Sequence, residues 1–224
     1  MSIPARPDAE AVLAETFACP PAVATAINGK AHLRDYPAKA VIVACDSVFD
    51  AVHVMVAGNA RMQAFGLDGR LVAVEDYSRG DLFGENGLFE TERAAHDIAA
   101  MVPSCAAAIS NTAFLDLMAN YNCVALAVSR RLVARLSRIT RRMVEGATLS
   151  ANGRIHAEIL RQAQAGTAMT ISPPPVLSQL ALTVHSTRET VSRAISALEK
   201  RGIIRRDGQG LTVVAPHRLE ELIF

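Results

Sequence analysis

The sequence predicts an α+β protein with an N-terminal antiparallel β-barrel or jelly-roll, a long central helix and a C-terminal winged helix-turn-helix domain. Three patterns support this fold class: short β-type runs after residue 36, a heptad-like apolar spacing after residue 119, and a capped amphipathic helix followed by a hairpin signal after residue 185. We therefore expect a β domain over residues 1–118, the long helix over 119–147 and the winged domain over 148–224.

The front of the chain begins with helical spacing and then changes to strands. Residues 8–30 are alanine-rich with helical spacing, which Pro20 and Pro21 interrupt. Short β-type runs separated by turn signals follow, at residues 40–43, 52–56 and 71–74. Such regularly spaced short strands indicate an antiparallel barrel or sandwich.

Helical periodicity returns at about residue 111. A seam with spacings typical of a coiled coil then runs through Val128, Leu132, Leu136, Ile139 and Met143. This helix either packs on its own domain or meets a copy of itself. Six arginines without an intervening acid accompany the seam, namely Arg130, Arg131, Arg135, Arg138, Arg141 and Arg142. They form either an anion site or a solvated face that complements an acidic front domain.

The last third of the chain predicts helices and a hairpin. A helix is expected over residues 152–164, followed by a stiff extended connector at 166–175, because that segment contains three consecutive prolines. A short helix over 176–182 and a turn at 184–186 come next. After the following helix, residues 203–214 predict a strand, a turn and a strand.

The helix that follows the turn has two different faces. Ser186 is expected to cap it and to form a capping box with Glu189, and Gly202 ends it after two cations. Its apolar stripe consists of Val191, Ile195 and Leu198, and its polar face of Arg188, Glu189, Ser192 and Arg193. In a major groove, Arg can bond guanine O6 and N7, and Glu can accept from cytosine N4. The alternative is an ordinary surface helix whose Glu189 only caps and whose arginines are solvated.

The net charge of +1 conceals an asymmetry along the 224-residue chain. Residues 1–118 carry a net charge of −7, residues 119–177 carry +6, and residues 178–224 carry +2. An acidic front and a basic back indicate that only the back half meets a polyanion such as double-stranded DNA.

The sequence also argues against several classes of protein. The four cysteines, Cys19, Cys45, Cys105 and Cys123, have no CxxC pair, so we expect no structural metal site. No Ser/His/Asp set or pair of catalytic carboxylates is evident, so we expect no enzyme. No export signal or membrane-spanning stretch is evident, so we expect a cytoplasmic protein with reduced thiols and no membrane partner.

Two motifs resemble those of the CRP/FNR family of transcription regulators. Gly80-Asp81-Leu82-Phe83-Gly84-Glu85 resembles the start of the phosphate-binding cassette in the family's cyclic-nucleotide domain. The run Ser186-Thr187-Arg188-Glu189-Thr190-Val191-Ser192-Arg193 resembles the family's recognition helix. The resemblance covers about residues 30–215. It implies a bacterial-type regulator with an N-terminal sensor domain, a homodimer about the long helix, and RNA polymerase as a further partner.

The resemblance also implies how such a protein reads DNA. Arg188, Glu189 and Arg193 would contact base pairs, and Ser186 and Thr187 would approach phosphates. Two recognition helices would enter successive major grooves about 34 Å apart on a near-palindrome. Half-sites of the TGTGA or TTGAT type both remain open, since Ser192 stands where members have Gly or Ser. His185 replaces the usual glycine of the turn, and histidine tolerates a positive φ better than most residues.

The effector is unknown from the sequence. Family members that bind cyclic AMP hold the ribose with the cassette Glu and the phosphate with an Arg followed by Ser or Thr. Glu85 follows Gly84 here, but the usual spacing reaches Ala94 and Ala95, with Arg93 one residue early. A cyclic nucleotide therefore remains a candidate only if Arg93 can replace the missing Arg. Thr140 lies near the position of the family's purine-contacting hydroxyls.

The residues bear on other effectors and functions as well. An iron–sulfur cluster is not expected, because Cys19 stands alone near the N-terminus. A redox pair of Cys19 and Cys105 is a further alternative to inert, buried thiols. Haem would need a histidine ligand, and no spacing singles out His32, His53 or His96. Two other functions stay open: a family member that acts without effector, and a small-molecule-binding barrel without a specific DNA target.

Overall fold

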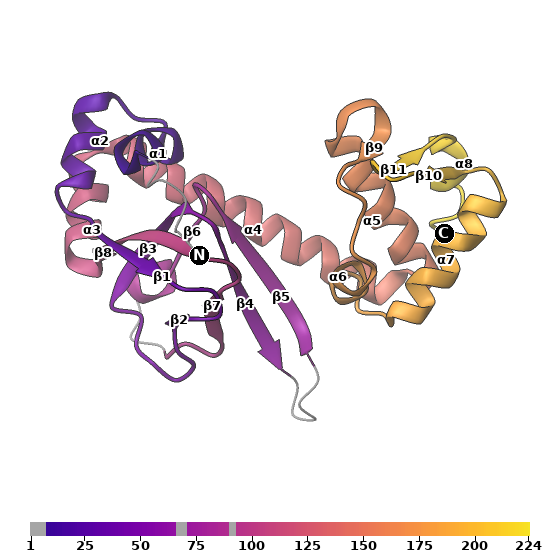
Figure 1. The fold of residues 1–224 in the computed structure, drawn as a ribbon, viewed down its shortest axis with the longest axis horizontal. Coiled ribbons are helices and arrows are strands. Elements are labelled where there is room, and N and C mark those ends of the chain that lie inside the picture. The colour runs from indigo at the N-terminus through magenta and orange to yellow at the C-terminus, as the bar shows by residue number, and fades with distance from the viewer. Residues whose placement is uncertain (1–7, 66–70, 90–92) are drawn as a thin grey trace. The chain divides into compact units, whose positions relative to one another are not determined.

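The computed structural model describes residues 8–65, 71–89 and 93–224 (Figure 1). The chain forms two compact units, Met1–Ala134 and Arg135–Phe224. The boundaries at residues 118 and 147 expected from the sequence stay predictions. Within the described residues, no helix combines the length and apolar character needed to cross a bilayer.

The first unit contains two four-stranded antiparallel sheets, as the sequence predicts. One sheet has the order β1 (His32–Tyr36), β8 (Ser104–Ser110), β3 (Ala51–Ala57) and β6 (Leu82–Phe83). The other has the order β2 (Val41–Val43), β7 (Asp97–Ala100), β4 (Asn59–Phe65) and β5 (Leu71–Ser78). The short helix η1 (Glu85–Leu88) follows β6 directly.

The core of the β-roll is formed by small and aromatic side chains from both sheets. Met55 of β3, Phe83 of β6 and Ala106 of β8 pack with residues of the second sheet, namely Val43, Ala60, Tyr77 and Ile98. The ring of Tyr77 lies 4.9 Å from that of Phe83. Ala94 belongs to the same buried cluster, although it lies outside the named strands.

Three helices cover a second apolar cluster of this unit. They are α1 (Ala9–Phe17), α2 (Pro21–Asn28) and α3 (Asn111–Asn120), which lie at one end of the β-roll in Figure 1. Asp8 caps α1 by accepting the backbone N–H groups of Glu10 and Ala11 at 3.0 and 3.4 Å. Phe17 and Phe114 are fully buried with ring centroids 6.1 Å apart. The predicted helical break at Pro20-Pro21 is confirmed.

The long helix α4 (Asn122–Thr148) has 27 residues. Val124 and Val128 near its start are buried in the core of the first unit. Farther along, its apolar side chains are exposed, so the helix carries a polar surface interrupted by an apolar stripe.

The second unit has the predicted winged helix-turn-helix architecture. Its helices are α5 (Ala151–Ala165), α6 (Leu177–Thr183), α7 (Arg188–Lys200) and α8 (Pro216–Glu220). Strands β10 (Ile204–Arg206) and β11 (Leu211–Val213) form the wing, and the irregular turn η2 (Thr167–Met169) precedes a short strand β9 (Thr170–Ile171). Ile155, Ile159, Ile195 and Leu198 are at the centre of its core.

Strand β9 corrects one prediction about this unit. The segment 166–175 was expected to be an extended connector rather than helix, but it contains the helical turn η2, and its residues Thr170 and Ile171 pair with Thr212 and Leu211 of β11. The hydroxyl groups of Thr170 and Thr212 lie 2.9 Å apart. The segment therefore adds a third strand to the wing.

Candidate nucleic-acid interface and sensor site

Helix α7 begins one residue later than the sequence predicts. Thr187 is its N-cap and accepts the N–H of Thr190 at 3.2 Å through Oγ1. The hydroxyl groups of Thr187 and Thr190 also lie 2.9 Å apart. The expectation that Ser186 caps the helix with Glu189 as its capping-box partner is therefore wrong. The cap moves because Thr187 has the extended backbone that a capping side chain needs.

The two faces of α7 differ in burial. Val191, Ile195 and Leu198 are at most 1% exposed. On the other face Arg188, Glu189 and Arg193 are exposed, and Ser192 is half-buried. Within the described part of the chain, Arg188, Glu189 and Arg193 have no hydrogen bond or ion pair with another side chain. The tips of these three side chains are thus available to a partner.

The turn before α7 is tightly built. His185 has a φ of 49°, the left-handed conformation predicted for a residue in the place of glycine. The N–H of Ser186 donates to the carbonyl of Ala181 at 2.9 Å, which joins the turn to α6. Val184 is buried and anchors the turn in the core. These contacts fix the angle at which the chain enters α7.

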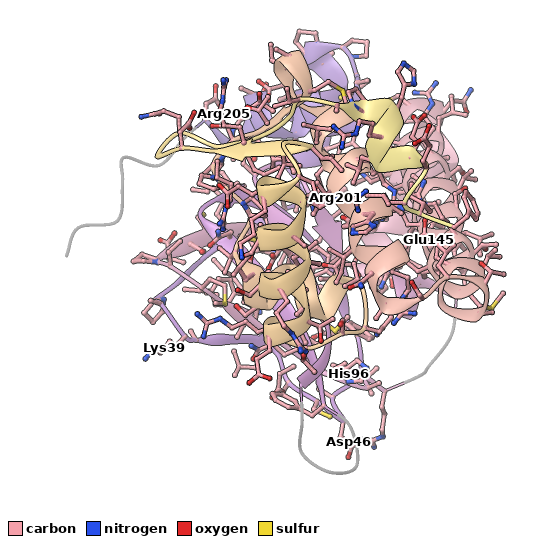
Figure 2. The ribbon with its side chains drawn as sticks, turned by 90° about the vertical axis from the view of Figure 1, so that its right-hand side faces the viewer. Lys39, Asp46, His96, Glu145, Arg201 and Arg205 are labelled. Atoms are coloured by element: carbon pink, nitrogen blue, oxygen red, sulfur yellow. The ribbon has the colours of Figure 1, made fainter. Side chains whose placement is uncertain are left out.

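The wing presents further cations. The carboxylate of Asp207 accepts the N–H groups of Gln209 and Gly210 at 2.8 and 3.0 Å, which closes the wing turn. Arg206 donates to Glu199 of α7 at 3.2 Å, and this contact lowers the pKa of Glu199. In Figure 2, Arg205 lies on the wing and Arg201 beside the C-terminal end of α7. Both are exposed.

Most of the predicted seam of α4 is exposed, but Val128 differs. Leu132, Leu136, Ile139 and Met143 are 41–68% exposed. Val128 is 2% exposed and packs in the core of its own unit, so its assignment to the seam is corrected. Leu126, Val133 and Val144, which the sequence analysis does not assign to the seam, are at least 50% exposed and form a second row about 100° around the helix from it. Helical angles, rather than a single row of spacings, would have found them.

One member of the arginine run has a structural partner. Arg131 donates to the carbonyl of Gly80 at 2.5 Å and lies 3.3 Å from the carboxylate of Asp81. The contact ties α4 to the first two residues of the cassette-like segment. Arg130, Arg141 and Arg142 are exposed. Arg131 therefore pairs with an acidic residue of the front domain, as the second interpretation of the arginine run predicts.

The cassette-like segment is a compact turn that depends on glycine. Gly84 has a φ of 91°, and a Cβ there would lie 2.5 Å from the carbonyl oxygen of Ala51. Gly87 packs against Phe49 with no room for a side chain. The side-chain amide of Asn111 donates to the carbonyls of Phe49 and Gly87 at 2.7 and 2.8 Å. Glu85 is buried at the start of η1.

Arg93 and Ala94 lie on opposite sides of the chain. Ala94 is 2% exposed in the core of the β-roll, and its N–H donates to the carbonyl of Ser47 at 2.7 Å. Arg93 is 63% exposed and donates to the carbonyl of Asp46 at 2.6 Å. Figure 2 places Asp46 at an outer loop of the β-roll. Ala95 is exposed as well.

This arrangement does not fit phosphate binding in the family's manner. The site would need a guanidinium beside Glu85 to pair with a buried phosphate. The Ala94 side chain ends at Cβ, and Arg93 is engaged at the surface with Asp46. Thr140 is exposed on α4 in the second unit, and its part in effector binding stays a prediction.

Cysteine and metal chemistry have little support at this site. All four cysteines are free thiols, and Cys105, the alternative redox partner of Cys19, is buried. The pKa of Cys19 is raised by burial and then by the nearby Cys123 thiol, so the neighbour of Cys19 is Cys123. Over residues 8–65, 71–89 and 93–224, no group of three or more His, Cys, Asp or Glu side chains could hold a metal ion.

The comparisons with known proteins follow the same division of the chain. The model of the cyclic nucleotide-binding domain matches residues 33–121, and the model of the Crp-like helix-turn-helix domain matches residues 153–222. This chain belongs to the CRP/FNR family of transcription regulators. It is a CRP-type, DNA-binding regulator, and the resemblance seen in the sequence is confirmed.

Two curated relatives within the CRP/FNR family span most of the chain. The cAMP-activated global transcriptional regulator CRP of Pasteurella multocida is 28% identical over 190 residues, covering 81% of this chain and 90% of the relative. The cAMP-activated global transcriptional regulator Vfr of Pseudomonas aeruginosa is 28% identical over 193 residues, covering 81% and 89%. These relatives are transcription regulators.

Solved structures share the fold. FixK2 from Bradyrhizobium japonicum has a TM-score of 0.66 at 21% identity and covers 86% of this chain and 96% of its own. CprK complexed with OCPA has a TM-score of 0.75 at 14% identity, covering 87% of this chain and 92% of CprK. These similarities show that the chain shares the fold of these structures.

His53 provides a test of the β-roll core through pH. It is 4% exposed and stacks on Phe83 at 5.0 Å; burial, and secondarily the charge of Arg34, lower its pKa to about 4. Between pH 6.5 and about pH 4, the His53 imidazole is protonated in the unfolded chain but stays neutral in the folded chain. Stability attributable to His53 is therefore lost as pH falls through this window, by about 3 kcal/mol in total.

The measurement is the free energy of unfolding in urea at pH 7 and pH 4.5, for the native chain and for His53→Gln. We expect the acid-induced loss to be about 2 kcal/mol smaller in His53→Gln. His217→Gln is the control, because His217 is exposed. Equal acid-induced losses of unfolding free energy in the native chain and in His53→Gln would contradict the claim that His53 is buried in its neutral form.

Proposed function

We propose that this regulator is a homodimer that binds a near-palindromic duplex with one α7 helix in each of two successive major grooves. The N-terminal residues of α7 read the bases, as they do in helix-turn-helix proteins. Arg188 and Arg193 donate to guanine and Glu189 accepts from cytosine. Ser186, Thr187 and Ser192 lie at the phosphates or beside the bases.

The observation that carries this proposal is that two arginines and a glutamate on the exposed face of α7 have no side-chain partner among the described residues. An arginine that only stabilises its own helix gains from a nearby carboxylate, as Arg161 of α5 does from Glu158. Arg188 and Arg193 lack such a partner in the described chain, while the opposite face is fixed in the core. The combination suits recognition of base edges by a rigid element.

The exposed stripe of α4 supports the homodimer. Seven large apolar side chains of one helix are exposed: Leu126, Leu132, Val133, Leu136, Ile139, Met143 and Val144. A continuous apolar surface of this kind is characteristic of a protein interface. The heptad-like spacing favours a second α4 helix as the partner, because like helices can interdigitate along such a seam.

The charge distribution supports a DNA partner at the back of the chain. The net charge is −7 over residues 1–118 and +8 over residues 119–224, where 15 Lys and Arg face 7 Asp and Glu. The duplex and RNA polymerase would be met in the cytoplasm. We assign no catalytic activity, in line with the regulators that the chain resembles.

For the effector, we propose that the β-roll does not take cyclic AMP or cyclic GMP in the manner of the family. Arg93 lies at the surface with Asp46, and Ala94 fills the core beside Phe83. A regulator that acts without effector, or with one of different chemistry, is consistent with that arrangement. Gly84 and Glu85 retain the turn of the cassette, but among the described residues the arginine that would bind the phosphate is missing from the site.

Calorimetry tests the proposal about the effector. Titration of the purified chain with cyclic AMP and with cyclic GMP should give a Kd weaker than about 1 mM, since the charge-assisted pair to the phosphate is missing. The regulator CRP of Pasteurella multocida, titrated with cyclic AMP under the same conditions, is the positive control. A fitted affinity in the micromolar range for this chain would refute the proposal.

A further inference from the structure

Arg154 makes an unusual set of contacts within the second unit. It lies in the first turn of α5 and is half-buried. Its guanidinium donates from Nε to the carbonyl of Val184 at 2.9 Å, from Nη1 to that of Leu149 at 2.9 Å, and from Nη2 to that of His185 at 3.2 Å. One side chain thus joins the end of α4 to the turn of the helix-turn-helix.

The three acceptors share a chemical property. Leu149 follows the last residue of α4, Val184 is the C-cap of α6, and His185 is the next residue. Carbonyls at helix C-termini lack partners within the helix and carry partial negative charge. A planar guanidinium can bond three of them at once in fixed directions, whereas a lysine ammonium would bond them only as a point charge.

These contacts reach the segment that sets the direction of α7. The left-handed backbone of His185, with φ at 49°, is strained for a residue other than glycine. Arg154 bonds the carbonyls of the two peptide units that flank His185. Arg188, the first helical residue of α7, follows three residues later. The position of the base-reading side chains therefore depends on a turn that Arg154 braces.

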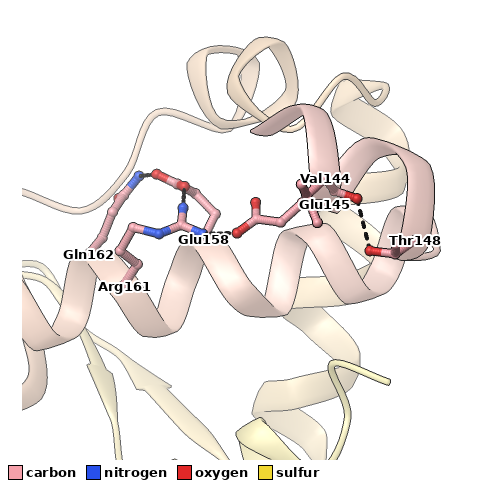
Figure 3. Close-up of polar contacts among 6 residues, drawn as sticks. All are labelled: Val144, Glu145, Thr148, Glu158, Arg161 and Gln162. Atoms are coloured by element: carbon pink, nitrogen blue, oxygen red, sulfur yellow. Dashed lines mark hydrogen bonds and ion pairs between the residues drawn. The ribbon is translucent and has the colours of Figure 1, made fainter. Parts of the chain in front are cut away.

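Helix α5 is a firm support for Arg154. Its N-cap Ser150 accepts the N–H of Gly153 at 3.0 Å, and Gly153 lies so close to the carbonyl of Ile223 that no side chain would fit. Figure 3 shows Arg161 of α5 bonded to Glu145 of α4 and to Glu158, with Gln162 donating to Glu158 at 2.8 Å. The bonds of Arg161 join the end of α4 to the C-terminal half of α5 and do not reach the turn before α7.

We propose that Arg154 is a positioning residue for DNA recognition, which couples the end of the long helix to the recognition helix through three backbone carbonyls and contacts no DNA itself. This inference rests on the proposed function. It implies that the fork of Arg154, rather than its positive charge, sets the accuracy with which both α7 helices meet the duplex.

The test compares Arg154→Lys with the matched control Arg161→Lys, which alters another half-buried arginine of the same helix, one that makes no contact with the turn. Both variants keep the net charge of the full-length chain. Affinities are measured for the selected palindromic duplex and for a random duplex over a series of salt concentrations. Hydrogen exchange of the Ser186 amide, which is bonded to Ala181, reports directly on the turn.

We expect Arg154→Lys to lose about tenfold in affinity for the palindrome, because charge-assisted bonds to the turn are lost in each protomer. Affinity for the random duplex and the salt slope should stay unchanged, since no phosphate contact is removed. Exchange at Ser186 should accelerate at least about tenfold in Arg154→Lys and stay within about twofold in Arg161→Lys.

Three results would overturn the inference. A salt slope reduced by about one would make Arg154 a phosphate contact. Equal losses on both duplexes together with a lower melting temperature would make it a stability residue only. Unchanged affinity and exchange would show that the turn holds without it. If the native chain selects no sequence at all, the proposed function fails instead, and the two failures are thus distinguished.

Discussion

Leu136→Glu should convert the dimer into monomers and lower the affinity for a palindromic duplex by about 10²–10⁴-fold. Leu136 is 64% exposed near the middle of the apolar stripe of α4. In a dimer, two glutamates would face each other in a desolvated seam, which is costly for unpaired charges. Without the dimer, the second half-site is no longer bound intramolecularly, and that loss accounts for most of the effect.

Analytical ultracentrifugation and a binding titration on the same samples would measure both consequences. Ala134→Glu is the matched control: it adds the same charge to an exposed position two residues away, on the other side of the helix. The control should remain dimeric and bind as the native chain does. A dimeric Leu136→Glu variant, or a native chain that is monomeric at micromolar concentration, would contradict the role of the stripe.

Arg188→Ala should reduce binding of the preferred duplex by about 1–3 kcal/mol per half-site and relax the preference at one base pair of each half-site. Since a dimer carries the change twice, the total is about 2–6 kcal/mol if the half-sites act independently. The physical reason is the loss of two bonds from a free guanidinium to a guanine edge. Affinity for random duplex should change far less.

Competition binding against duplexes that differ at single base pairs measures this effect. Arg201→Ala is the control, because Arg201 is exposed at the C-terminal end of α7, away from the residues that enter the groove. It should weaken specific and random duplexes alike, if it acts at all. Equal loss on every duplex for Arg188→Ala would assign that side chain to the phosphate backbone instead.

The sequence predicts those elements of the fold that have a local pattern of apolar residues. The stripe of Val191, Ile195 and Leu198 predicted the buried face of α7, and it is buried. The missed strands lack such a pattern. Strand β8 contains Ala106, Ala107 and Ala108, which are all buried, so neither alternation nor strand propensity marks it. Strand β9 exists only through its pairing with β11, about forty residues away, which no local signal reports.

The candidate sites show the same division. The sequence identified the residues of the exposed face of α7, but it misplaced the cap, because Ser186 and Thr187 are chemically equivalent there and the backbone decides between them. It noted that Arg93 is one residue early, but not which way the side chain points. That direction depends on the pairing of residues 46–48 with residues 93–94, a tertiary contact. Val128 has the spacing of the seam, but its side chain packs in the core of the first unit.

The central claim is that two α7 helices read one duplex with base specificity, and selection of bound duplexes from a random pool tests it most directly. We predict enrichment of a near-palindrome whose half-sites lie about 10 base pairs apart, with affinity that falls steeply with salt. A pool that stays random after repeated rounds, or a single half-site without symmetry, would contradict it.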